Sequence, residues 1–233
     1  LSPQSWFLSS RPKDLGRVYT EGAEDELGYQ NGFDRAHLNW YSVDPIFYSA
    51  QRPNGIGEQD LSSPFTRRLF RNEIFPDQDI VQGQTQALFS LDLNYKPTER
   101  GPYNFNPSAT DNVLNNPEAR FGGISRQLTT TDFERSNVEY IQFWLMDPFI
   151  YEEYANNQGG KVTFDLGNIS EDVLKDGRKQ YENGLPEDGS LLNTIETNWG
   201  VVPSNQSLVY TFSSAGNDRI NQDVGLDGLN DAA

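Results

Sequence analysis

Hydrophobic and polar residues alternate regularly in the second half of the chain, beginning near residue 88. Within residues 88–95, four apolar side chains share one face of an extended chain: Phe89, Leu91, Leu93 and Tyr95. A period of two is typical of a half-buried β-strand. We therefore predict a strand here, and we expect Pro97, Gly101 and Pro102 to break it, because proline cannot donate a ladder hydrogen bond.

The clearest alternation covers residues 137–146, where both faces of the predicted strand are informative. The face expected to point into the core carries Ile141, Phe143 and Leu145. The opposite face mixes aromatic and polar side chains, namely Tyr140, Gln142 and Trp144. Pro148 ends the pattern, and the segment is the strongest predicted strand of the chain.

Shorter patterns complete the prediction for the C-terminal half. Residues 162–166 alternate in the same way and predict a further strand. Ser170 is a suitable N-cap for one short helix, which Gly177 can terminate. Residues 208–212 predict a last strand. Several short strands joined by turn-rich connections indicate an all-β fold, an antiparallel β-sandwich of jelly-roll type.

Three regions of different character follow from these patterns. Residues 1–87 are crowded with turn signals and scattered aromatic residues, which predicts a long irregular N-terminal arm packed on a neighbouring structure, or a separate domain. Residues 88–215 form the predicted jelly-roll sandwich. Residues 216–233 are acidic and rich in Asn, Asp and Gly, as in a tail or linker.

The charge of the chain excludes several classes of partner. Eighteen basic residues stand against 34 acidic ones, which gives a net charge of −16 and argues against binding nucleic acid or anionic lipid. The chain has no cysteine, so disulfides and thiolate metal sites are excluded. Aromatic residues make up 12% of the chain and favour a folded core.

Catalytic chemistry has little support in the sequence. His37 is the sole histidine and would have to be the base of any Ser-His-Asp triad, but no nucleophile elbow accompanies it. A glycosidase needs two carboxyl groups at a defined separation, and acids such as Glu139 and Asp147 are expected to be surface charges. We predict that the chain is not an enzyme and uses no catalytic cofactor.

Two binding sites are candidates. Tyr140 and Trp144 share one face of the predicted strand and could stack on sugar rings, or pack beneath a second layer of the fold. The acidic C-terminal run could supply oxygen ligands to calcium through Asn221, Asp223, Asp227 and Asp231. Its spacing differs from that of an EF-hand loop, and a solvated tail is the simpler interpretation.

Four stretches of the sequence carry a specific resemblance, and two shorter ones extend it. The four are residues 94–104, 121–126, 137–149 and 167–177, and the two are residues 182–186 and 222–229. Together they resemble the SprA (also called Sov) family of gliding-motility proteins, which are outer-membrane translocons of the type IX secretion system. The similarity is specific from about residue 88 to 230 and weaker before it.

The resemblance implies a role in protein export and gliding motility. Members of the family are very large β-barrels that export folded cargo and carry soluble insertions between strands. The present chain is similar to one such insertion, expected at the bacterial outer membrane on the extracellular face rather than the periplasmic one. Its implied partners are the barrel of the parent translocon, accessory secretion proteins and cargo. The family offers no catalytic residues to carry over.

Three functions are therefore open. The first is a non-enzymatic module that caps or scaffolds the export pore, with the aromatic arm of residues 1–87 packed on the barrel rim. The second is a carbohydrate-binding sandwich for surface adhesion. The third, a calcium-stabilised structural domain, is compatible with either. We expect the chain to be a piece of a larger protein, without a membrane helix or signal peptide of its own.

Overall fold

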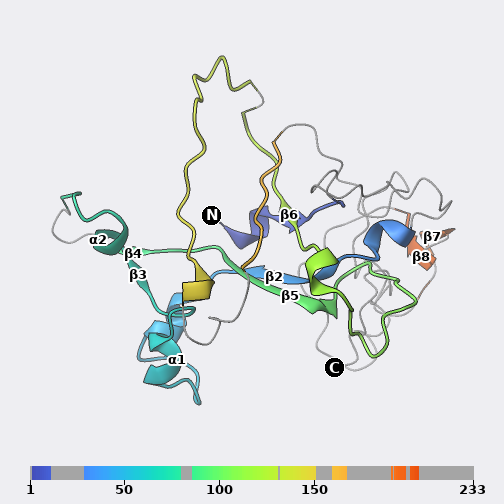
Figure 1. Ribbon diagram of the computed structural model, residues 1–233, viewed down its shortest axis with the longest axis horizontal. Helices are drawn as coiled ribbons and strands as arrows, with labels where there is room; N and C mark the ends of the chain where they lie inside the picture. The colour runs from blue at the N-terminus through green and yellow to red at the C-terminus, as the bar shows by residue number, and fades with distance from the viewer. Residues whose placement is uncertain are drawn as a thin grey trace.

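The computed structural model describes residues 2–11, 29–79, 86–130, 132–150, 159–166, 190, 192–197 and 200–204. Within these ranges the chain belongs to the all-β class, because its strands pair into small antiparallel sheets and its helices are few and short (Figure 1). The predicted helix at 170–177, the strand at 208–212 and the tail of residues 216–233 lie outside the described residues.

Eight strands form four two-stranded antiparallel sheets in the described part of the chain. The pairs are β1 (Phe7–Leu8) with β6 (Ile124–Ser125), β2 (Ala36–Tyr41) with β5 (Asp92–Arg100), β3 (Leu69–Phe70) with β4 (Ala87–Leu88), and β7 (Thr194–Thr197) with β8 (Gly200–Pro203). No closed sandwich forms among these strands. Three of the pairs join residues before 87 to later residues, so the N-terminal region and the predicted sandwich region share sheets.

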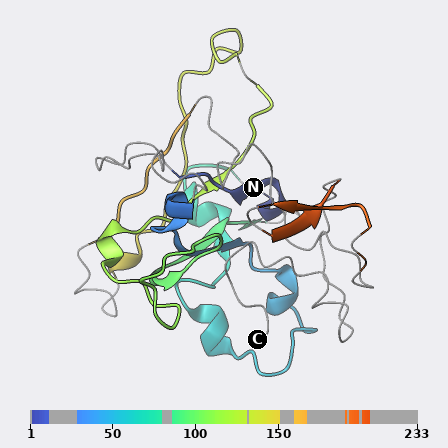
Figure 2. The same cartoon turned by 90° about the vertical axis from the view of Figure 1, so that its right-hand side faces the viewer.

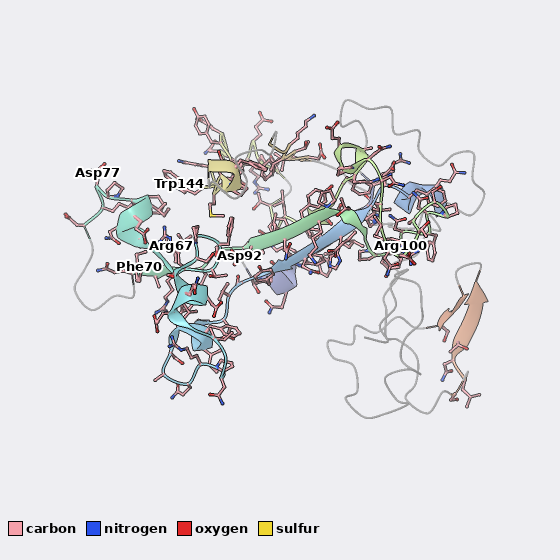
Figure 3. The ribbon with its side chains drawn as sticks, turned by 60° about the horizontal axis from the view of Figure 1, so that its bottom comes forward. Arg67, Phe70, Asp77, Asp92, Arg100 and Trp144 are labelled. Carbon is pink, nitrogen blue, oxygen red and sulfur yellow. The ribbon has the colours of Figure 1, made fainter. Side chains whose placement is uncertain are left out.

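The β2–β5 pair is the longest ladder and shows how proline is accommodated. Figure 3 shows Asp92 and Arg100 near opposite ends of β5. The register shifts between Ala36, opposite Arg100, and His37, opposite Lys96. β5 therefore has extra residues around Pro97 and bulges there. The strand continues past Pro97, contrary to the prediction, because a bulge leaves residues out of the ladder, where the missing N–H costs nothing. It ends at Arg100, directly before Gly101 and Pro102, as the sequence predicts.

The predicted core face of this strand is covered only in part. Phe89 is 68% exposed and Leu93 is 53% exposed. Near Tyr95 the face is covered: Leu38, opposite Tyr95, is buried, and a Cβ at Gly122 would lie 2.9 Å from both side chains. Alternation indicates which residues share a face, but a cover is needed before that face becomes a core.

The buried core lies where β2 meets the connection between β5 and β6. Its apolar members among the described residues are Ala36, Leu38, Tyr103, Leu114 and Phe121. The Phe121 carbonyl accepts the Ala36 N–H at 2.8 Å, so the core backbone is tied together as well as packed. Two polar residues, Arg35 and Asn104, are also buried among the described residues, so buried polar contacts contribute to the fold as well.

Arg35 is the largest of these buried polar groups and is fully inaccessible to solvent. Its Nη1 donates to the Ser9 carbonyl at 2.7 Å, and its guanidinium lies 5.1 Å from the centroid of the Phe121 ring. Burial lowers the pKa of Arg35 to about 10, against a smaller opposing effect of Tyr103. The side chain thus links β1, β2 and the β5–β6 connection.

Two short helices precede β4. They are α1 (Glu58–Ser62) and α2 (Arg71–Ile74). At the start of α2, the Phe70 N–H donates to Glu73 Oε1 at 3.0 Å, and this bond, followed by the bond from Arg67, lowers the pKa of Glu73. An acidic residue in the first turn also suits the helix dipole. No helix in the described ranges is long and apolar enough to cross a membrane.

Candidate functional site

A long excursion between β6 and the 3₁₀ turn at Pro148–Ile150 carries the candidate site. Figures 1 and 2 both show this part of the chain standing away from the paired strands. A compact turn begins its return: Asp132 Oδ1 accepts the Arg135 N–H at 2.8 Å, and the Phe133 carbonyl accepts the Val138 N–H at 2.9 Å. Asn137 closes the turn at a positive φ of 49°, which asparagine tolerates better than most residues.

The residues after this turn, 138–147, are here called the contact segment. The segment is extended but belongs to no ladder, and residues 138–146 are exposed. Tyr140 is 83% exposed and Trp144 is 64% exposed. The predicted strand at 137–146 is therefore wrong for this structure, because the segment joins no sheet. The predicted core face is wrong as well, because Ile141, Phe143 and Leu145 are each at least half exposed.

A second extended segment, residues 161–166, is called the companion segment. It too lies outside any ladder, contrary to the predicted strand, and Val162, Phe164 and Leu166 are each more than half exposed. The contact and companion segments together provide half of the large apolar side chains exposed among the described residues. Monomeric proteins rarely expose a contiguous apolar patch this extensive unless it binds something.

Aromatic contacts position both segments. The rings of Phe143 and Phe164 lie 4.5 Å apart between centroids, tilted by 38°. A Cβ at Gly160 would lie 3.5 Å from Phe149 Cζ, in ordinary contact. Phe143 thus meets Phe164, whereas Phe149, further along the chain, meets Gly160, which precedes Phe164. The two segments therefore run antiparallel, as the two arms of a hairpin do.

Trp144 links the contact segment to the body of the protein. Its ring packs edge-on against Phe75, which follows α2, with centroids 5.9 Å apart and planes at 89°. Figure 3 shows Trp144 beside the 3₁₀ turn, on the side of α2. An edge-to-face pair of this kind contributes about 1 kcal/mol beyond buried area. Trp144 and Phe143 therefore hold the segment in place, and its remaining apolar side chains make no ring contact in the described part of the chain.

The main chain of the contact segment is available as well. Among the residues that the structure describes, no backbone group of residues 139–146 takes part in a backbone hydrogen bond. Backbone N–H and C=O groups are obligatory hydrogen-bonding groups, and in the described part of the chain those of residues 139–146 have no backbone partner. An unpaired, flat, apolar stretch is a template for an added strand.

The residues around the segment are mostly acidic, and Arg135 and Lys161 are the nearest basic residues along the chain. Glu139 and Asp147 lie eight residues apart, so they share a face in an extended chain and flank the apolar positions between them. Residues 136–160 contain four acidic residues and no basic one. The segment therefore presents an apolar centre with an acidic group at each end.

A polar cavity of about 510 Å³ is a second feature of the surface, and sequence reasoning missed it. Asp34 lines the cavity and pairs with Arg120 and, at 3.8 Å, with Arg11. Arg120 also donates to the Asn115 carbonyl, from Nε at 2.9 Å and from Nη2 at 2.6 Å. The Asp34–Arg120 pair holds the β5–β6 connection against the residues before β2. The charged groups that line the cavity therefore stabilise the fold.

The residues considered for catalysis lie on separate parts of the chain. His37, on β2, lies 3.3 Å from Glu99 and 3.1 Å from the Asn39 side chain. Glu139 and Asp147 are exposed. The described ranges contain no group of three or more residues suited to hold a metal ion, whereas the predicted calcium ligands Asn221, Asp223, Asp227 and Asp231 lie outside them.

Comparison with known proteins adds no family. Neither the search against protein-family models nor the search of curated proteins finds a match to this chain.

Proposed function

We propose that the chain is a non-enzymatic contact module of an outer-membrane translocon of the type IX secretion kind, acting in protein export and gliding motility. The observation that carries this proposal is the contact segment, a run of exposed aromatic and aliphatic side chains with an unpaired main chain. Such a surface suits binding to another polypeptide. The resemblance of residues 94–104, 121–126 and 137–149 to that family supplies the biological setting.

The proposed partners follow from this setting. The module caps or scaffolds the export pore at the extracellular face of the outer membrane, and it contacts the barrel of the parent translocon, accessory secretion proteins or cargo. A net charge of −16 supports this role, because a strongly charged surface stays soluble and resists nonspecific adhesion to passing proteins.

The proposal includes the finer architecture. We propose that the sheets complete a jelly-roll type sandwich when the module is assembled with its partner. The period-two alternation of residues 137–146 and 162–166 supports this arrangement, as does the contact of Phe143 with Phe164. An isolated two-stranded hairpin is at best marginally stable in water. We therefore expect the sandwich to form only when the module is assembled with its partner.

The first test replaces exposed side chains that make no contact needed by the fold. In the parent translocon, Tyr140→Ala combined with Leu145→Ala is expected to lower cargo secretion about tenfold, because large buried side chains dominate binding at interfaces. The measurement is the amount of cargo in the medium at equal translocon abundance. Leu192→Ala is the matched control, since Leu192 is 77% exposed but lies near β7, away from the contact segment. Secretion that is equal in the double variant and the control would contradict the proposal.

Glycan binding is the second candidate function, and the exposure of Tyr140 favours it. An aromatic ring that is 83% exposed can stack on a sugar face. If the chain binds surface polysaccharides, calorimetric titration of the intact chain should give a measurable heat that Tyr140→Ala removes and Leu192→Ala preserves. A flat titration across a panel of polysaccharides would eliminate this candidate.

A further inference from the structure

The contact segment combines three properties that are rarely found together in one folded chain. It is extended, its backbone groups have no backbone partner among the described residues, and the side chains of residues 138–146 are exposed on both faces. A partner that covered only the side chains would remove their apolar surface from water but would leave the main-chain N–H and C=O groups without hydrogen-bond partners. Pairing with a strand satisfies both requirements at once.

We infer that the contact segment binds its partner by β-strand addition, and that the partner supplies an extended strand with basic residues at both ends of an apolar centre. This inference rests on the proposed contact function and names the chemistry of its partner. On one face the segment reads acidic, three apolar residues, acidic: Glu139, Ile141, Phe143, Leu145 and Asp147. Residues directly opposite in paired strands interact, and opposite charges there are favourable.

The required partner pattern follows from this face. Its strand carries Lys or Arg at two positions eight residues apart, with an apolar side chain at every second position between them. Because Glu139 and Asp147 are placed symmetrically about Phe143, the pattern fits in either strand direction. The other face of the segment carries a central amide, Gln142, between Tyr140 and Trp144, so a polar residue is suited to the position opposite Gln142.

A second copy of this chain is a poorer occupant. Antiparallel self-pairing centred on Gln142 matches Tyr140 with Trp144 and places Glu139 opposite Leu145. That register leaves both acidic ends without a basic partner and brings together two chains that each carry a charge of −16. Like charge disfavours self-association, whereas a basic strand is attracted to the same site.

The experiment uses the full chain and a soluble probe peptide, acetyl-Lys-Thr-Val-Thr-Val-Thr-Val-Thr-Lys-amide. Hydrogen exchange of individual amides is followed by NMR with and without the peptide, at low and high salt. The expected result is about tenfold slower exchange at alternate amides of residues 139–146, because one edge of a strand presents every second N–H. The same peptide with Glu in place of both Lys residues should have no effect, and salt should weaken the protection.

A matched pair of variants separates main-chain pairing from side-chain contact. Gln142→Pro combined with Phe143→Pro removes one N–H from each edge of an extended chain, since successive N–H groups point to opposite edges. Gln142→Ala combined with Phe143→Ala removes the same side chains and keeps both N–H groups. Protection lost in the proline variant and kept in the alanine variant supports the inference.

Four other results would overturn the inference. Equal protection in the proline and alanine variants would show that the main chain is not used. Slow exchange in the dilute chain without peptide would show that the segment is paired internally, and protection that rises with protein concentration alone would identify a second copy as the occupant. Absence of any peptide effect would remove strand addition, while the secretion experiment with Tyr140→Ala and Leu145→Ala would still test the contact function separately.

Discussion

Gly101→Ala is expected to destabilise the folded chain by about 3 kcal/mol or more, because its methyl group has no space. A Cβ at Gly101 would lie 2.3 Å from the carbonyl oxygen of Ala36 and 2.6 Å from its carbonyl carbon. Both are backbone atoms of β2, so no side chain can rotate away. The chain would have to separate β2 from the residue that follows β5, and the Gly101 N–H bond to the Arg35 carbonyl, at 3.2 Å, would be lost.

Gly57→Ala is the matched control for this prediction. The nearest atom to a Cβ at Gly57 is Asp60 Oδ2 at 3.6 Å, which is ordinary van der Waals contact. Its effect should stay within about 0.5 kcal/mol in urea denaturation, where the midpoints of both variants are compared at an unchanged slope. If Gly101→Ala unfolds at the same midpoint as Gly57→Ala, the close approach of β2 to Gly101 is not part of the native fold.

The strand pattern of the sequence predicted the fold class but not the layers. Alternation in residues 88–95 located the region of β5, since a period of two requires an extended chain. It could not show that the bulge near Pro97 would let the strand continue to Arg100. Nor could it show which face is covered, because cover is supplied by residues far away in sequence.

The same limit explains the candidate site. Tyr140 and Trp144 were found from sequence because their spacing places them on one face of an extended segment. Their exposure, and that of Ile141 on the face expected to be buried, depends on whether another layer packs there. The polar cavity left no signal, because Asp34 and Arg120 are 86 residues apart and become neighbours only through the fold.

Asn104→Ala is the second substitution with a large expected effect, about 3 kcal/mol of lost stability. Asn104 is completely buried, and its Nδ2 donates to the Arg35 carbonyl at 2.5 Å and to the Phe33 carbonyl at 3.2 Å. Its Oδ1 accepts the Asn106 N–H at 2.9 Å. Alanine would leave these groups with fewer partners in a site that water does not reach, and each buried group left unsatisfied costs about 1–3 kcal/mol.

Two further variants make the Asn104 prediction specific to its hydrogen bonds. Asn104→Asp keeps the shape and the acceptor but loses both donated bonds and buries a carboxylate, so it should destabilise at least as much as alanine. Asn94→Ala, at an exposed position of β5, should change stability by no more than about 0.5 kcal/mol. Urea denaturation that ranks Asn104→Ala with Asn94→Ala would mean that the small apolar core, rather than this buried amide, holds the β5–β6 connection to β2.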